Sequence, residues 1–181
     1  MPGYFSCTLP QDWLVDGVPD NHATDDKITG VARQGPWSGE IPVRISVYYY
    51  ATGNRLYASA RQYVQRHSEP VGGTALSGSR YTPAAPIRVA NRAAQMFEHT
   101  HGEFLPLRND LDTPGKPMTD DPRVYERPDL MARPVAVRER FVVIPADDDG
   151  FYVLHYSAAA DEFATHLPHF NQLVASFRPA R

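Results

Sequence analysis

The sequence predicts an α+β fold in which a mainly antiparallel β-sheet packs against two helices. Residues 41–50 place five apolar side chains on one face of a strand, as expected for a half-buried strand. Other extended segments are joined by short turns, which favours antiparallel neighbours. Two segments with helical periodicity, 56–67 and 167–177, lie far apart in the chain. A helix could therefore cover either face of the sheet.

The first half of the chain contains three predicted strands. Residues 4–9 alternate between apolar and small side chains and end at Pro10, residues 28–34 form a second extended segment, and Ile41 to Tyr50 is the clearest strand. We expect Trp13 to pack inward. Residues 16–27 are rich in Asp, Asn, Pro and Gly and predict a loop, and residues 35–39 predict a turn.

A helix is predicted to follow the third strand. Asn54 is the predicted N-cap, and Pro70 ends the helix. The apolar positions follow helical spacing at Leu56, Ala60, Tyr63 and Val64, with His67 on the same face.

Two hairpins are predicted in the second half of the chain. Residues 87–90 and 93–101 form the first through Asn91-Arg92, and residues 135–143 and 151–157 form the second through the Asp-rich turn 147–150. Between the hairpins, residues 105–134 carry six prolines and many aspartates with little periodicity. This stretch predicts an irregular insertion within a single domain of residues 1–181.

The chain ends with a strand and an amphipathic helix. Leu167, Phe170, Val174 and Phe177 recur at steps of three and four, so they share one helical face. Burying these side chains contributes about 6–12 kcal/mol, whereas ordering the backbone that carries them costs about 11–22 kcal/mol. The helix must therefore pack on a sheet that includes the strand before it.

Composition restricts the function classes. The net charge of −3 and the absence of charge blocks argue against a nucleic-acid partner, and no apolar stretch predicts a transmembrane segment. The single cysteine excludes an intrachain disulfide. The compartment is open: the chain reads as cytoplasmic as written, or as periplasmic if a signal peptide has been removed.

In combination and order, these landmarks resemble the PsbP-like family. The opening Phe5-x-x-x-Leu9-Pro10-x-x-Trp13 resembles the start of such domains, and the strand 41–49 with its helix 56–64 fits the same plan. Three later features fit this plan as well: the hairpin at 89–94, the strand that begins Gly150-Phe151-Tyr152, and the last helix with Phe163, Phe170 and Ser176-Phe177. Asn91, where a glycine is common, is a departure. The resemblance covers nearly all of the chain except residues 105–134.

The resemblance implies an α/β/α sandwich with a central antiparallel sheet and helices on both faces. Relatives include a photosystem subunit, a Ran-binding import factor, DcrB-like lipoproteins and Eag-type chaperones. Their roles share no catalytic residues, so none is carried over to this chain. A shared fold does not define a shared function.

A metal site is predicted at the end of one strand. If the strand continues through His99-Thr100-His101-Gly102-Glu103, its two histidines and Glu103 point to one face at intervals of about 6.6 Å. Two nitrogen ligands and one oxygen ligand suit a divalent ion. The alternative is a polar, solvent-facing strand end, because Gly102 can break the alternation.

A set of tyrosines suggests a second kind of site. Tyr48, Tyr49, Tyr50, Tyr57 and Tyr63 could line a partner groove, while core packing between sheet and helix is expected to take at least half of them. We predict partner binding by Tyr48, Tyr50, Tyr57 and Tyr63.

Three weaker motifs favour structural interpretations. The acidic residues 147–149 favour a hairpin turn over a calcium loop, because the spaced carboxylates of such a loop are missing. The acidic residues of the insertion (Asp110, Asp112, Asp120, Asp121 and Asp129) favour solvated surface. The glycine-rich residues 72–79 lack the lysine of a phosphate-binding loop, and Cys7 reads as a small buried side chain rather than a nucleophile.

Two functional hypotheses follow. The first is a non-enzymatic domain that needs no cofactor and binds a protein partner, with a second copy of the chain as one candidate. The second is a metal-binding or small-ligand-binding protein that uses His99, His101 and Glu103. Hydrolase activity is the least supported class, because no nucleophile is identified.

Overall fold

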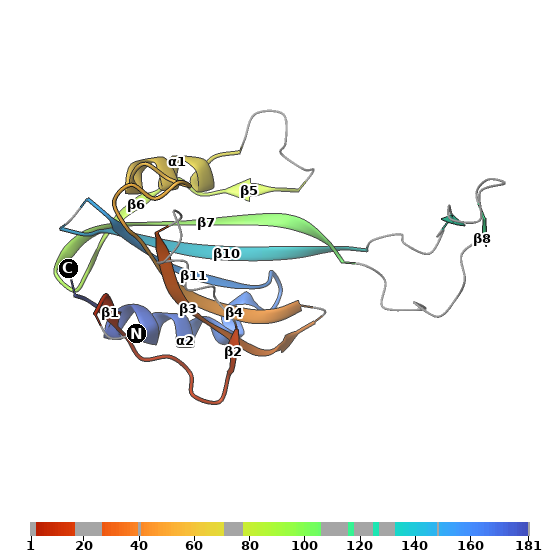
Figure 1. The fold of residues 1–181 in the computed structure, drawn as a ribbon. Helices are drawn as coiled ribbons and strands as arrows, with labels where there is room; N and C mark the ends of the chain where they lie inside the picture. The colour runs from red at the N-terminus through yellow and green to blue at the C-terminus, as the bar shows by residue number, and fades with distance from the viewer. Residues whose placement is uncertain are drawn as a thin grey trace.

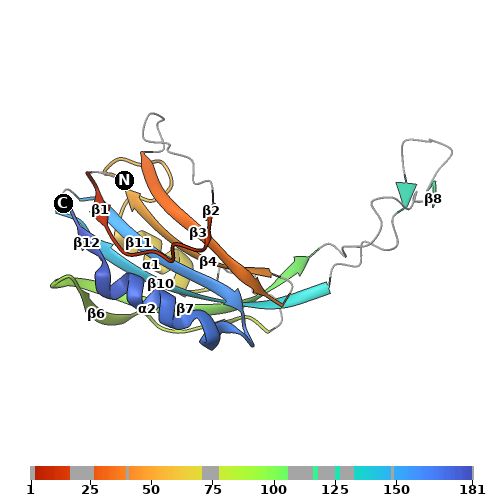
Figure 2. The same ribbon diagram turned by 90° about the horizontal axis from the view of Figure 1, so that it is seen from below.

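A large β-sheet lies between two helices, α1 (Ala60–Ser68) on one face and α2 (Phe163–Ser176) on the other (Figure 1). Figure 2 shows α2 lying across the sheet on the side opposite α1. The computed structural model describes residues 3–16, 27–39, 41–70, 78–105, 116–117, 125–126, 133–147 and 149–180. Within them, the predicted α+β class with a central antiparallel sheet is confirmed.

All strand pairs of this sheet are antiparallel. Seven strands follow one another in the order β2-β3-β4-β11-β10-β7-β5, and β6 also pairs with β7. The strands are β2 (Leu14–Asp16), β3 (Ile28–Ser38), β4 (Ile41–Tyr50), β5 (Arg80–Tyr81), β6 (Ala85–Val89), β7 (Arg92–Leu105), β10 (Arg133–Pro145) and β11 (Phe151–Ala159).

Two short strand pairs lie outside the large sheet. Strand β1 (Phe5–Ser6) pairs with β12 (Arg178–Pro179), which ties the N-terminal segment to the residues that follow α2. Strand β8 (Lys116–Pro117) pairs with β9 (Tyr125–Glu126) within the predicted insertion, most of which lies outside the described residues. The five aspartates named there also lie outside them, as do residues 17–26 of the predicted loop and residues 71–77 before and within the glycine-rich stretch.

The α2 face of the sheet carries the larger part of the core. Strand β4 has the predicted bounds, and its Val43, Ile45 and Val47 are fully buried on this face. They pack in one cluster with Phe170 and Phe177 from the C-terminal segment. Phe177 follows α2 directly and is also fully buried, so the predicted packing of this segment on the sheet is confirmed.

The α1 face carries a second cluster, formed around aromatic rings. Phe141 of β10 stacks on Phe97 of β7, with ring centroids 5.0 Å apart. Tyr50 of β4 stacks on Phe151 of β11 at 4.8 Å. Helix α1 covers these rings with Tyr63, so each face of the central strands is buried under one helix.

Helix α1 starts later than the sequence predicts. Its N-cap is Ser59, whose hydroxyl accepts a hydrogen bond from the backbone N–H of Gln62. Asn54 instead accepts from the N–H groups of Leu56 and Tyr57 and stabilises the turn before the helix. Leu56 is therefore outside the helix and half-exposed, which corrects the prediction that it lies on the apolar face.

Strand β3 is longer than predicted. It continues through residues 35–38, where a turn was expected, with a register shift between Gln34 and Trp37. A bulge at this point accommodates Pro36, which has no N–H to donate to a neighbouring strand. The turn itself is at Gly39, whose φ is +62°.

Both predicted hairpins are confirmed. The β6–β7 turn is Ala90-Asn91, one residue earlier than predicted, and both residues have positive φ. The β10–β11 turn spans the acidic residues and closes with a hydrogen bond from the Ala146 N–H to the Gly150 carbonyl.

Candidate functional site

Four histidines lie around the carboxylate of Glu139 on the α1 face of the sheet. Strand register brings the three histidines of the strands to Glu139, because Glu139 of β10 lies opposite His99 of β7, and His155 of β11 lies opposite Phe141, two residues further along β10. The fourth, His67, comes from α1. Side chains two residues apart on a strand share a face. We call this group the histidine cluster; it comprises His67, His99, His101, Glu139 and His155.

Both oxygens of Glu139 are in contact with histidines. His99 Nε2 is hydrogen-bonded to Oε2, and His155 Nε2 lies 2.7 Å from Oε1. His101 Nδ1 lies 3.5 Å from Oε2. The Glu139 and His99 side chains are only 16% and 12% exposed, so these contacts are shielded from water.

The hydrogen bonds of His99 indicate that its ring is positively charged. Its Nδ1 lies 3.1 Å from the backbone carbonyl of His67, and its Nε2 contacts the Glu139 carboxylate. Both partners are acceptors, so both ring nitrogens must donate. Burial opposes this charge, but the hydrogen bond and negative charge of Glu139 outweigh it and raise the pKa of His99.

Glu139 is ionised for the same reason. Burial alone would raise the pKa of its carboxyl group, but the hydrogen bonds from His155 and His99 lower it. The site therefore contains a shielded carboxylate–imidazolium pair.

His67 connects the histidine cluster to α1. Burial, together with the nearby charge of His99, lowers its pKa from 6.5 to about 4, so its ring is neutral at pH 7. The ring stacks on Tyr63 at 4.2 Å. Its Nε2 lies 2.9 Å from the Tyr57 hydroxyl, whose proton it can accept. Tyr57 and Tyr63 thus support the cluster from the helix side.

The structure brings together two of the three residues predicted to bind a metal. His99 and His101 share a face as expected, but Glu139 supplies the nearby carboxylate. Glu103 is exposed and lies opposite Val135, four positions from Glu139 along β10. The sequence does carry a sign of Glu139, because it is an acidic residue on the apolar face of its strand, between Val137 and Phe141.

The predicted partner-binding tyrosines divide into two groups. Tyr50 and Tyr63 are 8% and 5% exposed, so they belong to the core beneath α1 and offer no surface to a partner. Tyr48 and Tyr57 are half-buried. Tyr49 is buried on the opposite face of the sheet.

Large apolar side chains are exposed at another place, along the β2 edge of the sheet. Leu14, Val15 and Trp37 are 69%, 72% and 54% exposed; we call them the β2 edge patch. Strand β2 is the last strand on this side of the described sheet. A groove of about 400 Å³ adjoins Leu14 and is lined by Trp13, Pro36, His166 and His169 among others.

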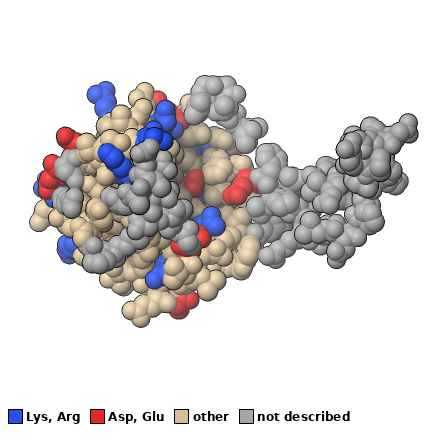
Figure 3. Space-filling model, viewed as in Figure 1, with Lys and Arg blue, Asp and Glu red and all other residues tan. Residues whose placement is uncertain are grey.

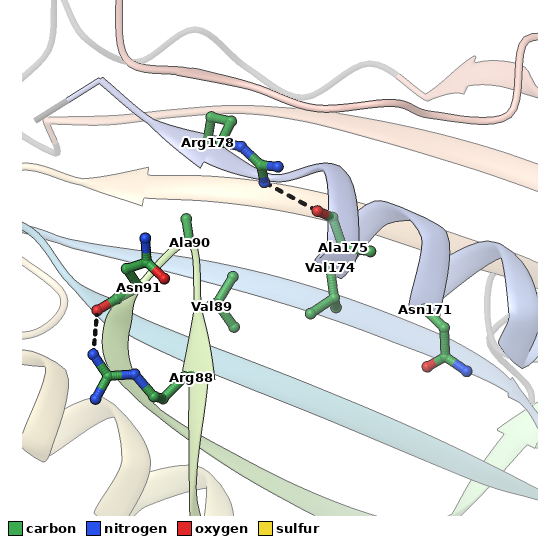
Figure 4. Close-up of a pocket in the computed structure, with 8 residues that line it drawn as sticks. All are labelled: Arg88, Val89, Ala90, Asn91, Asn171, Val174, Ala175 and Arg178. Atoms are coloured by element: carbon green, nitrogen blue, oxygen red, sulfur yellow. Dashed lines mark hydrogen bonds between the residues drawn. The ribbon is translucent and has the colours of Figure 1, made fainter.

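A second groove, of about 580 Å³, lies between the β6–β7 turn and the end of α2 (Figure 4). Its two arginines already bind backbone carbonyls. Arg88 donates to the Asn91 carbonyl at 2.8 Å, and Arg178 donates to those of Ala175 and Phe177. On the face seen in Figure 3, the described charged side chains of both signs are interspersed.

Asp147 of the acidic turn and Cys7 have structural roles. The Asp147 carboxylate accepts hydrogen bonds from both terminal nitrogens of Arg92, which stabilises the β10–β11 turn. Asp148 lies outside the described residues. Cys7 is half-buried beside the core, and burial raises the pKa of its thiol, which works against nucleophilic chemistry.

None of the described helices is long and apolar enough to span a membrane.

Neither a protein-family model nor a curated protein matches the sequence. Among solved structures, the chain is similar to LpqN of Mycobacterium tuberculosis, a protein involved in cell envelope biogenesis. The identity is 13% and the TM-score 0.52, over 100% of this chain and 87% of LpqN. A weaker match is PA94 of Pseudomonas aeruginosa, a protein of unknown function. Its identity is 15% and its TM-score 0.44, over 94% of this chain and 93% of PA94.

Proposed function

We propose that this chain is a non-enzymatic, PsbP-like binding domain that recognises an extended segment of a protein partner through the β2 edge patch. The observation that carries the proposal is the exposure of Leu14, Val15 and Trp37 along one edge of the sheet. Most large apolar side chains of the described chain are buried. Three of the exposed ones lie together on β2 and β3, and this distinguishes the edge from the rest of the described surface.

The edge suits an added strand. Residues 14–16 pair with β3 on one side only, and no described strand pairs with the other side. A strand with unpaired backbone groups can hydrogen-bond to an extended peptide, while exposed apolar side chains on the edge contact the peptide's side chains. The groove beside Leu14 would accept one such side chain.

The fold comparison is consistent with this proposal. LpqN, whose fold this chain resembles over its whole length, is involved in cell envelope biogenesis. A binding role associated with the cell envelope is therefore the setting we propose.

Site-specific photo-crosslinking tests the proposal. A photoreactive amino acid is placed at Val15 of the full chain and, as a control, at Gln172, an exposed position on α2. We expect a discrete adduct from Val15 in cells of the source organism, none from Gln172, and loss of the adduct when Leu14→Lys is added. An adduct of two copies of the chain would identify a homodimer. Adducts that are identical at both positions, or absent at Val15, would refute the proposal.

A further inference from the structure

We propose that His99, His101 and Glu139 bind a divalent transition-metal ion, and that Zn²⁺ fits this site best. The site lies between β7 and β10, whereas the β2 edge patch is at the opposite end of the strand order. The two sites are therefore independent in position and in chemistry.

The ligand atoms are spaced closely enough to share one ion. Each of the three residues offers one ligand atom, and these atoms all lie within 4.8 Å of one another. Around a tetrahedral zinc ion with bonds of about 2.0–2.2 Å, neighbouring ligand atoms are about 3.3–3.6 Å apart. The separation of His101 Nδ1 from Glu139 Oε2 is 3.5 Å. To bind the ion, His99 must release its Nε2 proton to solvent, because an imidazole nitrogen binds a metal only when deprotonated. Its closer contact with Glu139 must then open to the same spacing.

His101 provides a second observation. Its Nδ1 is buried and has no hydrogen-bond partner among the described residues, although the ring itself is 32% exposed. Buried polar atoms are nearly always paired, so an unpaired nitrogen beside a carboxylate needs an explanation. A bound cation would provide the missing partner for this nitrogen.

Neighbouring groups orient the proposed ligands through hydrogen bonds, as is usual around bound metal ions. Metal-binding histidines donate their other ring N–H to a carbonyl or carboxylate, which fixes the ring orientation. His99 makes this contact through Nδ1 to the His67 carbonyl, 3.1 Å away. The second oxygen of Glu139 is held by His155 Nε2, 2.7 Å away, and the His155 ring stacks on Phe141 at 4.5 Å.

The donor set indicates which ion is bound. Two imidazole nitrogens with one carboxylate oxygen favour zinc over magnesium or calcium, which prefer oxygen ligands. Three protein ligands also leave a fourth position on a tetrahedral ion.

Isothermal titration calorimetry of the metal-free full chain with Zn²⁺ tests the site. We expect one ion per chain, affinity weaker by about 100-fold or more in His101→Ala and Glu139→Gln, and no change in two matched controls. The controls are Glu103→Gln, on the same strand as the histidines, and His166→Ala, on α2. Mg²⁺ should not compete.

Two results would overturn the proposal: no Zn²⁺ binding by the unaltered chain, or equal affinity in His101→Ala. Because Glu139→Gln is also expected to affect stability, His101→Ala is the decisive variant. Zinc-edge anomalous scattering from crystals of the unaltered chain gives a second test. The peak must lie between the His99, His101 and Glu139 side chains, and a peak elsewhere refutes the assignment.

Discussion

Replacing Glu139 with glutamine should destabilise the metal-free protein measurably, because it removes the charge that His99 and His155 face. Glutamine keeps the size of the side chain and one acceptor oxygen. It cannot accept at both of its terminal atoms, and it leaves the His99 imidazolium without a counter-charge.

The magnitude follows from the two hydrogen bonds. A hydrogen bond to a charged group contributes about 1.5–3 kcal/mol, compared with about 0.5–1.5 kcal/mol for a neutral one. In Glu139→Gln, the two hydrogen bonds from His99 and His155 lose their charged acceptor and become bonds to a neutral group, or are lost. The expected loss in the free energy of unfolding is therefore about 2–3 kcal/mol. The Glu139 side chain is only 16% exposed, so solvent screening reduces this value little.

The loss should depend on pH in a defined direction. The pKa of His99 is raised above 6.5 in the folded protein, so its contribution is complete below pH 6.5 and is lost as pH rises through the folded value. The pKa of Glu139 is lowered below 4.5, so its contribution is complete above pH 4.5 and is lost as pH falls. The effect of Glu139→Gln should therefore be greatest between pH 4.5 and 6.5.

Urea denaturation at about pH 5.5 and pH 9, in the presence of a chelator, measures both effects. Glu103→Gln makes the same chemical change at an exposed position and should alter the free energy of unfolding by less than about 0.5 kcal/mol. A loss in Glu139→Gln no larger than in this control, or a loss that is larger at pH 9, would refute the reasoning.

Two further predictions concern the two helices. Phe170→Ala, at a side chain that is 1% exposed and stacks on Tyr156, should lower the free energy of unfolding by about 3–5 kcal/mol in thermal or urea denaturation. The exposed Gln172→Ala on the same helix is the control, and equal effects of the two would show that α2 does not pack as described. Because the pKa of His67 falls from 6.5 to about 4 on folding, the protein should lose stability as pH falls from 6.5 towards 4. His67→Phe should flatten this dependence in urea denaturation between pH 7 and 5, and an unchanged slope would contradict the assigned neutral state.

The sequence predicts those elements whose periodicity is complete within one segment. Strand β4 has the predicted bounds because its five apolar positions alternate without interruption. Helix α2 is found where a helix was predicted, but it begins at Phe163, four residues before the predicted segment, and ends before Phe177. Leu173 replaces Leu167 and Val174 among its buried positions. Leu167 and Val174 still pack against the same core cluster but are only partly buried.

Helix ends were harder to predict, although the signal was present. Ser59 and Gln62 have the spacing of a capping box, and the Gln62 side chain accepts the backbone N–H of Ala58 at 2.6 Å. Asn54 offers an equally good N-cap side chain five residues earlier. The choice between them depends on where the chain leaves β4, which local sequence does not define.

The histidine cluster could not be predicted in full, because it depends on how the strands pair. The spacing of His99 and His101 places both on one strand face, but their partner Glu139 is 40 residues away from His99. Which residue lies opposite His99 depends on strand register, and a shift of one residue would turn Glu139 to the other face. An acidic residue on an apolar strand face is the signal that could have identified it.

Hydrogen–deuterium exchange of the complex with the crosslinked partner tests the proposed binding function most directly. If an extended partner segment adds to the β2 edge, amide exchange should slow in residues 14–16, and the segment from Tyr48 to Tyr57 should be unchanged. Slower exchange around Tyr48 and Tyr57, with residues 14–16 unaffected, would place the partner on the α1 face of the sheet and contradict the account.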